Sequence, residues 1–293
     1  MTSKFTFRQL SQEDLPQMYR TFIDAFSKYK VKMDMTKEAF KERMEGKVNI
    51  SYRHSIGAFH GEKLIGFIFN SLNTFEGQKS AYNGGTGVLY DYWGYGLTKR
   101  MYDHVVPILT EAGVQRCVLE VITTNTPAIK AYEKSGFTKT KNFKCFKLNN
   151  ELPLRESHKG LVIKKATPKS LSSYQKLATA NPSMLDSFGH LILNIRNETC
   201  FEARLDNGIV GYIIYQVQKG RISQICVKEG YRRQGIGNAL MRRALNAGEN
   251  KNLTVLNVEE SEAEIIQFLK SNGFVNELDQ FEMVMDLGVS RKA

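Results

Sequence analysis

The stretch Gly230–Leu245, which reads GYRRQGIGNALMRRAL, decides the fold. An apolar, strand-like run precedes it, and apolar residues recur behind its glycines at three- or four-residue steps, as in an amphipathic helix. A strand that ends in a glycine turn before a helix presents unpaired backbone N–H groups and the positive end of the helix dipole. The stretch therefore predicts a phosphate or pyrophosphate site, in which Gly235 and Gly237 leave room and Arg232 and Arg233 add charge.

A second version of this turn lies 139 positions upstream, where Asp91–Val106 reads DYWGYGLTKRMYDHVV. It keeps the glycine that corresponds to Gly235, but Trp93 stands at the place of Arg232 and Thr98 at the place of Gly237. The pair raises the question whether the chain has two working sites, or one site and its remnant.

The two turns belong to a longer internal repeat, which is seen in matches that keep their order while their offset falls from 156 to 145, 139 and 137. The matching segments are Phe7–Leu15 with Ile163–Leu171, Ala58–Phe69 with Ala203–Ile214, the two turns, and Ser135–Phe137 with Asn272–Phe274. This order describes one fold written twice. We predict domains at residues 1–150 and 160–293, joined by a polar linker at Asn149–Gly160.

Periodicity predicts the same elements in each copy. A strand leads to helical segments and then to a hairpin, whose turns are His60-Gly61-Glu62 and Asp206-Asn207-Gly208. A strand ending near Val88 or Val227 enters the glycine turn, and a long helix, a strand and a short helix follow. A last strand, Lys144–Leu148 or Glu282–Leu287, is expected to close each copy, giving an α/β fold with mixed sheets.

Two motifs give the copies a family resemblance. Arg-x-x-Gly-x-Gly before an apolar-periodic helix resembles the acetyl-CoA signature of the Gcn5-related N-acetyltransferases, the GNAT superfamily. The segment NTPAIKAYEKSGF resembles that family's second signature, through Asn125, Ala128, Tyr132, Gly136 and Phe137. The resemblance implies a tandem GNAT protein that uses acetyl-CoA, with the diphosphate on the turn and the pantetheine arm between two splayed strands.

The resemblance also implies the residues of the site. Tyr132 would protonate the departing thiolate, whereas the second copy has Leu269 at that place and Glu262 at the place of Asn125. The implied cofactor-binding residues are Val227, Arg232, Arg233, Gln234, Gly235, Ile236 and Gly237 in the second copy, and Val88, Trp93, Gly94, Tyr95, Gly96, Leu97, Thr98 and Asn125 in the first.

An amine nucleophile needs a group to take its proton. Glu120, on the strand facing this region, is the leading candidate, and Glu76 and Asp91 lie in segments near the expected site. Each carboxylate could equally be a solvated surface group, Tyr132 a core aromatic, and Trp93 a packing or stacking residue. The acceptor site is expected to draw on the loop Asn73–Gly87 and on the helices after the first strand.

Composition limits the remaining classes of function. With 42% apolar and 24% charged residues, no apolar run near the roughly 20 residues of a membrane span and no signal-peptide core, the chain is expected to be cytoplasmic. The net charge of +11 is spread widely and no nucleic-acid motif accompanies it, so nucleic acid is not the expected partner. The four cysteines fit buried free thiols, and no metal-ligand spacing occurs.

The sequence therefore predicts an N-acetyltransferase that moves acetyl from acetyl-CoA to a primary amine, with the chemistry in the first copy and the second as a cofactor-binding or structural partner. Two alternatives stay open. One is transfer of a longer acyl or an aminoacyl group, and the other is a non-catalytic acyl-CoA-binding sensor or interaction protein. The acceptor and the oligomeric state are not indicated.

Overall fold

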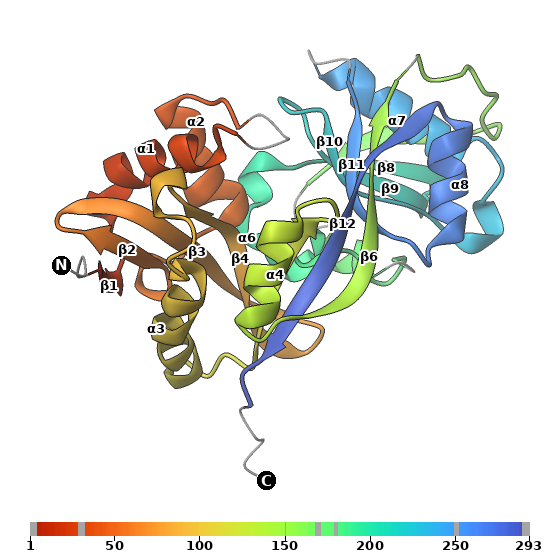
Figure 1. Cartoon of the computed structure of the whole chain (residues 1–293). Coiled ribbons are helices and arrows are strands. Elements are labelled where there is room, and N and C mark those ends of the chain that lie inside the picture. The colour runs from red at the N-terminus through yellow and green to blue at the C-terminus, as the bar shows by residue number, and fades with distance from the viewer. Residues whose placement is uncertain are drawn as a thin grey trace, which may run out of the picture. The chain divides into compact units, whose positions relative to one another are not determined.

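The computed structural model describes residues 5–28, 33–149, 151–167, 171–178, 181–248 and 252–288 (Figure 1). The chain forms two compact units. The first unit holds Met1–Thr140 together with Phe281–Ala293, and the second holds Lys141–Gln280. Asn150 of the predicted linker and the first four residues of the chain lie outside the described residues.

The first unit is built on a mixed sheet with the strand order β1-β2-β3-β4-β5-β12-β6. Strands β1 to β4 pair antiparallel, and β4 pairs parallel to β5. The bounds are β1 (Phe5–Gln9), β2 (Ile56–His60), β3 (Lys63–Phe75), β4 (Gln78–Val88), β5 (Arg116–Ile122), β6 (Thr138–Leu148) and β12 (Phe274–Asp286).

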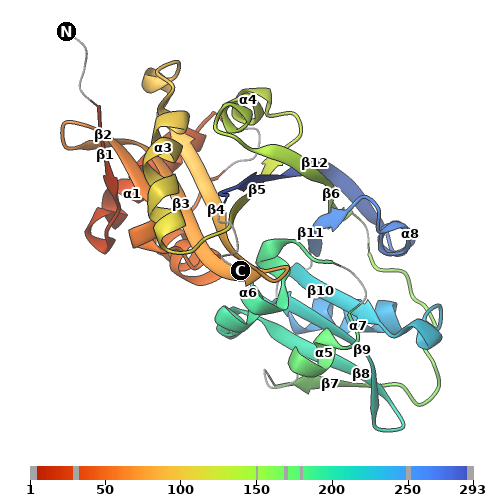
Figure 2. The same cartoon turned by 90° about the horizontal axis from the view of Figure 1, so that it is seen from below.

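Helices cover both faces of this sheet, which explains why β2 and the first half of β3 are apolar almost without interruption. Helices α3 (Leu97–Glu111) and α4 (Thr126–Lys134) share one core with the sheet, and α1 (Leu15–Phe26) and α2 (Lys37–Glu42) share another. Figure 2 shows α3 lying across β2 to β4. The apolar face of α3 is buried at Leu97, Met101 and Val105, and the helix continues through Pro107.

The second unit repeats this plan, with the strand order β12-β6-β11-β10-β9-β8-β7. Its further strands are β7 (Val162–Ala166), β8 (Thr199–Leu205), β9 (Gly208–Gln216), β10 (Arg221–Val227) and β11 (Thr254–Glu259). Its helices are α5 (Leu171–Gln175), α6 (Phe188–Leu193), α7 (Ile236–Ala247) and α8 (Ala263–Ser271). Helices α7 and α8 pack on one core of the unit, and α5 and α6 pack on the other.

The last strands of the two copies are exchanged. Lys144–Leu148 lies in the second unit, where Phe146 pairs with Val255 and Lys147 with Thr254. The end of β12 belongs to the first unit, where the hydroxyl group of Thr138 donates to the carbonyl of Val284. The expectation that each copy closes with its own last strand is therefore wrong, and the compact units differ from the 1–150 and 160–293 division at this strand.

Most of the other predicted elements are present. Both hairpin turns lie where they were predicted, with Asp206 and Asn207 in the left-handed region, and both glycine turns lead from a strand into a helix. The predicted loop Asn73–Gly87 is wrong, because nearly all of it belongs to the β3–β4 hairpin, which turns at Glu76 and Gly77. The bulge in β4 at Gly84 and its many small residues obscured the strand pattern.

Within the described residues, no helix combines the length and apolarity needed to cross a bilayer.

Candidate functional site

The two glycine turns have the same backbone shape. A short 3-10 helix, Tyr90–Tyr92 or Glu229–Tyr231, precedes each one. In the first turn Gly94 and Gly96 have φ of +85° and +65°, and in the second Arg233 and Gly235 have φ of +63° and +75°. Since a non-glycine residue such as Arg233 rarely adopts this conformation, the repeated pattern indicates one conserved turn geometry within the chain.

Trp93 and Arg232 play the same structural part in these turns. The Trp93 indole Nε1 donates to the carbonyl of Val88 at 2.8 Å, and the Arg232 Nε donates to the carbonyl of Val227 at 3.1 Å. Each side chain thus ties its turn to the end of the preceding strand. Arg232 also pairs with Glu264 at 2.5 Å, whereas Trp93 brings no cation and is 54% exposed. The sequence suggested packing or stacking as the role of Trp93, and neither of these alternatives included this hydrogen bond.

The turns differ in what lies against them. Around Gly94 and Gly96, an added Cβ would meet no atom of the described residues within 4 Å. A Cβ added at Gly235 would lie 2.0 Å from the carbonyl oxygen of Glu156. Among the described residues the first turn therefore has free space beside its glycines, whereas the segment Glu151–Lys159, which we call the strap, packs against Gly235 of the second turn.

Hydrogen bonds hold the strap in place. The His158 backbone N–H donates to the carbonyl of Gln234 at 3.1 Å, inside the turn itself. The Asn238 amide donates to the carbonyl of Pro153 at 3.0 Å, and the Arg155 guanidinium donates to the carbonyl of Ser271 at 2.7 Å. The strap also places Leu152, a buried residue, in the core of the second unit. The predicted linker is thus a packed part of the second unit.

The last glycine of the second turn has a packing role. A Cβ at Gly237 would lie 2.7 Å from the ring of Phe268 on α8, so these two helices approach closely at this point. In the first unit Thr98 stands at the place of Gly237. Ala131 stands at the place of Phe268 when α4 and α8 are aligned at their first residues. The second copy therefore combines the small Gly237 with the large Phe268, and the first combines the larger Thr98 with the small Ala131.

In both units the strand that enters the turn diverges from its parallel neighbour. The last pair between β4 and β5 is Tyr82 with Val118, and the last pair between β10 and β11 is Ile222 with Val255. A bulge lies next to each point of divergence. A splayed pair exposes unpaired backbone groups, which can hydrogen-bond an extended ligand as an added strand would.

A cavity of about 590 Å³ follows the splay of the second unit. One end is lined by the turn and by Arg155 of the strap, and the other by Ser183, Asp186, Ser223 and Asn257. This volume is within the range of small-molecule and cofactor sites.

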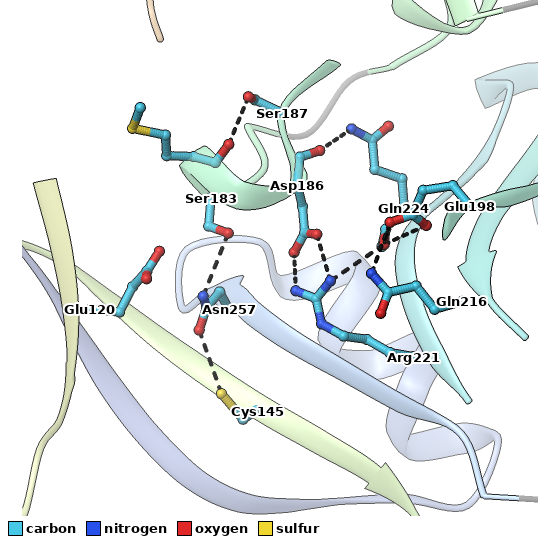
Figure 3. A network of polar contacts seen from close by, with 12 residues as sticks. Glu120, Cys145, Ser183, Asp186, Ser187, Glu198, Gln216, Arg221, Gln224 and Asn257 are labelled. Atoms are coloured by element: carbon cyan, nitrogen blue, oxygen red, sulfur yellow. Dashed lines mark hydrogen bonds and ion pairs between the residues drawn. The ribbon is translucent and has the colours of Figure 1, made fainter. Parts of the chain in front are cut away.

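Asp186, Ser223 and Gln224 line this cavity and belong to a buried polar network (Figure 3). Arg221 makes two bonds to Asp186, at 2.6 and 2.8 Å, and both side chains are nearly buried. The Ser223 hydroxyl and the Gln216 amide donate to Glu198. Within this network the Arg221 and Asp186 charges neutralise each other.

The candidate bases of the first unit are separated by the structure. Glu120 lies on β5, two residues beyond the last pair with β4, where it accepts a hydrogen bond from the Tyr82 hydroxyl. It is therefore in the splay. Glu76 lies in the β3–β4 turn, at the opposite end of β4, and pairs with Arg116 at 3.0 Å, so its placement near the site is wrong. Asp91 is exposed in the short helix before the turn.

Tyr132 is buried on α4, with its ring edge-to-face against Tyr102 and Phe137. Asn125 caps the same helix, and its side chain accepts from the N–H of Ala128 at 3.3 Å. At the corresponding place in α8, Glu262 makes no such side-chain cap and Leu269 is fully buried. The phenol therefore occurs only in the first copy, as the sequence indicates.

Sequence reasoning missed the strap and Tyr82. The strap shows a mostly polar composition typical of linkers, with two leucines, Leu152 and Leu154, of which only Leu152 is buried. Tyr82 could have been noticed as an aromatic residue directly before the small residues of β4, but nothing in the sequence joins it to Glu120.

The four cysteines form no disulfide bond within the described residues; Cys117, Cys145 and Cys200 are buried as predicted, and Cys226 is half-buried. Among the described residues, no group of three or more histidine, cysteine, aspartate or glutamate side chains could hold a metal ion.

Comparison with known proteins fits this geometry. Residues 15–137 match the acetyltransferase (GNAT) family, and residues 196–276 match the acetyltransferase (GNAT) domain. The chain thus belongs to the GNAT acetyltransferase family and contains two of its domains in tandem. No curated protein matches the chain.

Solved structures match over nearly the whole chain. A GCN5-related N-acetyltransferase from Sphaerobacter thermophilus has a TM-score of 0.75 at 15% identity, covering 97% of this chain and 96% of its own. A putative acetyltransferase from Pyrococcus horikoshii has a TM-score of 0.71 at 15% identity, covering 98% and 90%. A tandem GNAT protein from the clavulanic acid biosynthesis pathway has a TM-score of 0.73 at 12% identity, covering 98% and 100%. At these identities the likeness is one of fold.

Proposed function

We propose that the chain transfers acetyl from acetyl-CoA to the primary amine of an acceptor, and that this transfer takes place in the first unit. The observation that carries the proposal is the contrast between the turns. The first turn has free space beside its glycines within the described residues and belongs to the unit with Tyr132, whereas the strap packs on Gly235 of the second turn, which belongs to the unit with Leu269. The arginines of the second turn therefore do not by themselves make it the catalytic site.

In this proposal the first turn holds the diphosphate through backbone N–H groups at the start of α3, near Gly96 and Thr98. The pantetheine arm pairs with the splayed end of β4. The acceptor nitrogen attacks the thioester carbonyl carbon, the carbon–sulfur bond breaks, and an amide and free CoA form. Glu120 takes the proton that the nitrogen loses, and Tyr132 gives its proton to the departing sulfur.

A second candidate function is supported by the cavity of the second unit. Its volume and its position along the splay suit an acyl-CoA or a fragment of one, and Leu269 offers no proton donor there. Arg232 and Arg233 both line this cavity, so a diphosphate bound there would meet them. The second unit would then be a binding module, and the sensor alternative would apply to this half of the chain.

The test is release of free CoA thiol from acetyl-CoA, measured against a panel of amines that contains a polyamine, an aminoglycoside and a peptide with a free N-terminus and a lysine. Amine-dependent thiol release, with an acetylated amine found by mass spectrometry, is the expected result. Competition with longer acyl-CoAs separates acetyl transfer from transfer of a longer group. CoA binding without thiol release for any amine would contradict the enzyme and favour the sensor.

A further inference from the structure

Behind Tyr132, the first unit contains a buried chain of polar side chains. The Asn83 amide donates to the Tyr102 hydroxyl at 2.6 Å and to the Thr86 hydroxyl at 2.7 Å. The same side chain accepts from the N–H of Gly85 at 2.9 Å, which fixes its orientation. Asn83 is 7% exposed and Tyr102 is 2% exposed, so these bonds lie in the interior.

Tyr102 connects this chain to Tyr132. The two rings meet edge-to-face at 6.5 Å between centroids, and both pack against Phe137. Burial raises the pKa of Tyr102 well above its usual value, and the neighbouring Tyr132 adds to this effect. Tyr102 is therefore a neutral phenol, held on one side by Asn83 and in contact with Tyr132 on the other.

The second unit is an internal control for this arrangement, because its equivalent elements begin at matching residues. There Ile222 stands at the place of Asn83, Met241 at that of Tyr102 and Leu269 at that of Tyr132. All three are buried in one apolar core. Ile225, at the place of Thr86, packs against the same core.

The comparison argues against a purely structural role for the polar set. A buried amide must recover the cost of leaving water through its hydrogen bonds, and an apolar residue of similar size avoids that cost. The second unit shows that this fold accepts apolar residues at all of these positions. The polar residues occur together in the unit with the phenol and are replaced together in the unit without it.

We infer that Asn83 and Tyr102 are positioning residues that hold the Tyr132 phenol for its part in acetyl transfer. The inference rests on the proposed function. Tyr102 acts through its contact with Tyr132, and Asn83 acts by fixing the Tyr102 hydroxyl.

The test compares the turnover of full-length variants with acetyl-CoA and the best amine of the panel. Tyr102→Phe keeps the ring and removes the hydroxyl. We expect kcat to fall about 10-fold while KM for acetyl-CoA stays within about twofold, since misplacing a reacting group slows chemistry more than binding. Tyr174→Phe is the matched control, because it removes a fully buried hydroxyl that donates to Glu202 in the second unit. It should leave kcat unchanged.

The double variant Tyr102→Phe/Tyr132→Phe gives the sharper readout. If Tyr102 acts through Tyr132, the double variant should be no slower than Tyr132→Phe alone, whereas independent structural damage would multiply the two losses. A second variant, Asn83→Ile/Tyr102→Met, installs the residues of the second unit and should also lower kcat with KM kept. This second variant replaces Tyr102→Phe in the test if Tyr102→Phe does not fold.

The possible failures are distinguishable. If the wild-type chain has no turnover, the proposed function falls and this inference falls with it. If Tyr132→Phe slows turnover but Tyr102→Phe matches Tyr174→Phe, only the inference about Tyr102 and Asn83 is overturned. Multiplicative losses in the double variant would overturn it as well.

Discussion

Alanine at Gly235 and alanine at Gly96 should have different effects, although the two glycines are equivalent in the repeat. Both have φ in the left-handed region, at +75° and +65°, so each substitution costs roughly 1–2 kcal/mol of backbone strain. At Gly96 an added Cβ meets no atom of the described part of the chain within 4 Å, so no further cost is expected. At Gly235 the Cβ would lie 2.0 Å from the Glu156 carbonyl oxygen, and the strap must move by about 1 Å or more.

The additional loss of stability in Gly235→Ala can be estimated from the hydrogen bonds of the strap. Three bonds join it to the turn and to the neighbouring helices, through His158, Pro153 and Arg155. At about 1 kcal/mol each, losing one to three of them makes Gly235→Ala less stable than Gly96→Ala by about 1–3 kcal/mol. Denaturant titration measures this difference for the second unit.

Hydrogen exchange at the His158 amide reports the strap directly, since this amide donates to Gln234. It should lose protection in Gly235→Ala and keep it in Gly96→Ala. If the two variants were equally stable and the His158 amide stayed protected in both, the packing of the strap against Gly235 would be refuted.

The remaining predictions concern the first turn, the thiols and the helix contact in the second unit. Trp93 is the only tryptophan of the chain and half-exposed on the first turn, so CoA binding there should change its fluorescence, and an unchanged spectrum at saturating CoA would place CoA elsewhere. Trp93→Arg should tighten CoA binding in calorimetry by about 1.5–3 kcal/mol, and a loss of affinity would argue against a diphosphate at this turn. Burial raises the pKa of Cys117 and Cys200 to about 12, so both thiols should stay unreactive toward a disulfide reagent at pH 8 until the chain unfolds, and rapid labelling of either would contradict their burial. Gly237→Thr should destabilise the second unit by about 1–3 kcal/mol through Phe268, and Phe268→Ala in the same chain should recover part of this loss, whereas additive losses would disprove the contact.

The sequence predicted the repeat, the glycine turns and the absence of a phenol in the second copy, because these depend on local patterns. Turn glycines and helix periodicity are set by residues close in the chain. The exchange of last strands was not predictable in the same way. Lys144–Leu148 and Glu282–Leu287 are both short segments rich in apolar residues, and such a composition predicts a buried strand but specifies no particular partner.

Two features of the site depend on contacts across long sequence distances. The strap reaches Gly235 over about 80 residues, and a polar segment carries no mark of the surface on which it lies. Glu76 was placed near the site because the β3–β4 hairpin was taken for a loop; as a strand, β4 carries Glu76 to the end opposite the turn. Trp93 could be aligned with Arg232 from the sequence. Only the structure shows that each side chain donates a hydrogen bond to the carbonyl group at the end of the preceding strand.

The most direct test of the central claim, that chemistry takes place in the first unit, is the rate of amine-dependent thiol release for two variants measured side by side. Tyr132→Phe keeps the ring and removes the hydroxyl group, which is the proposed proton donor of the first unit. Arg232→Trp puts the first unit's residue into the second turn, where the indole can keep the bond to the Val227 carbonyl. The account predicts that Tyr132→Phe lowers kcat by up to roughly 10²–10⁴-fold while Arg232→Trp stays near the wild-type rate. Full turnover in Tyr132→Phe together with its loss in Arg232→Trp would contradict the account and assign catalysis to the second unit.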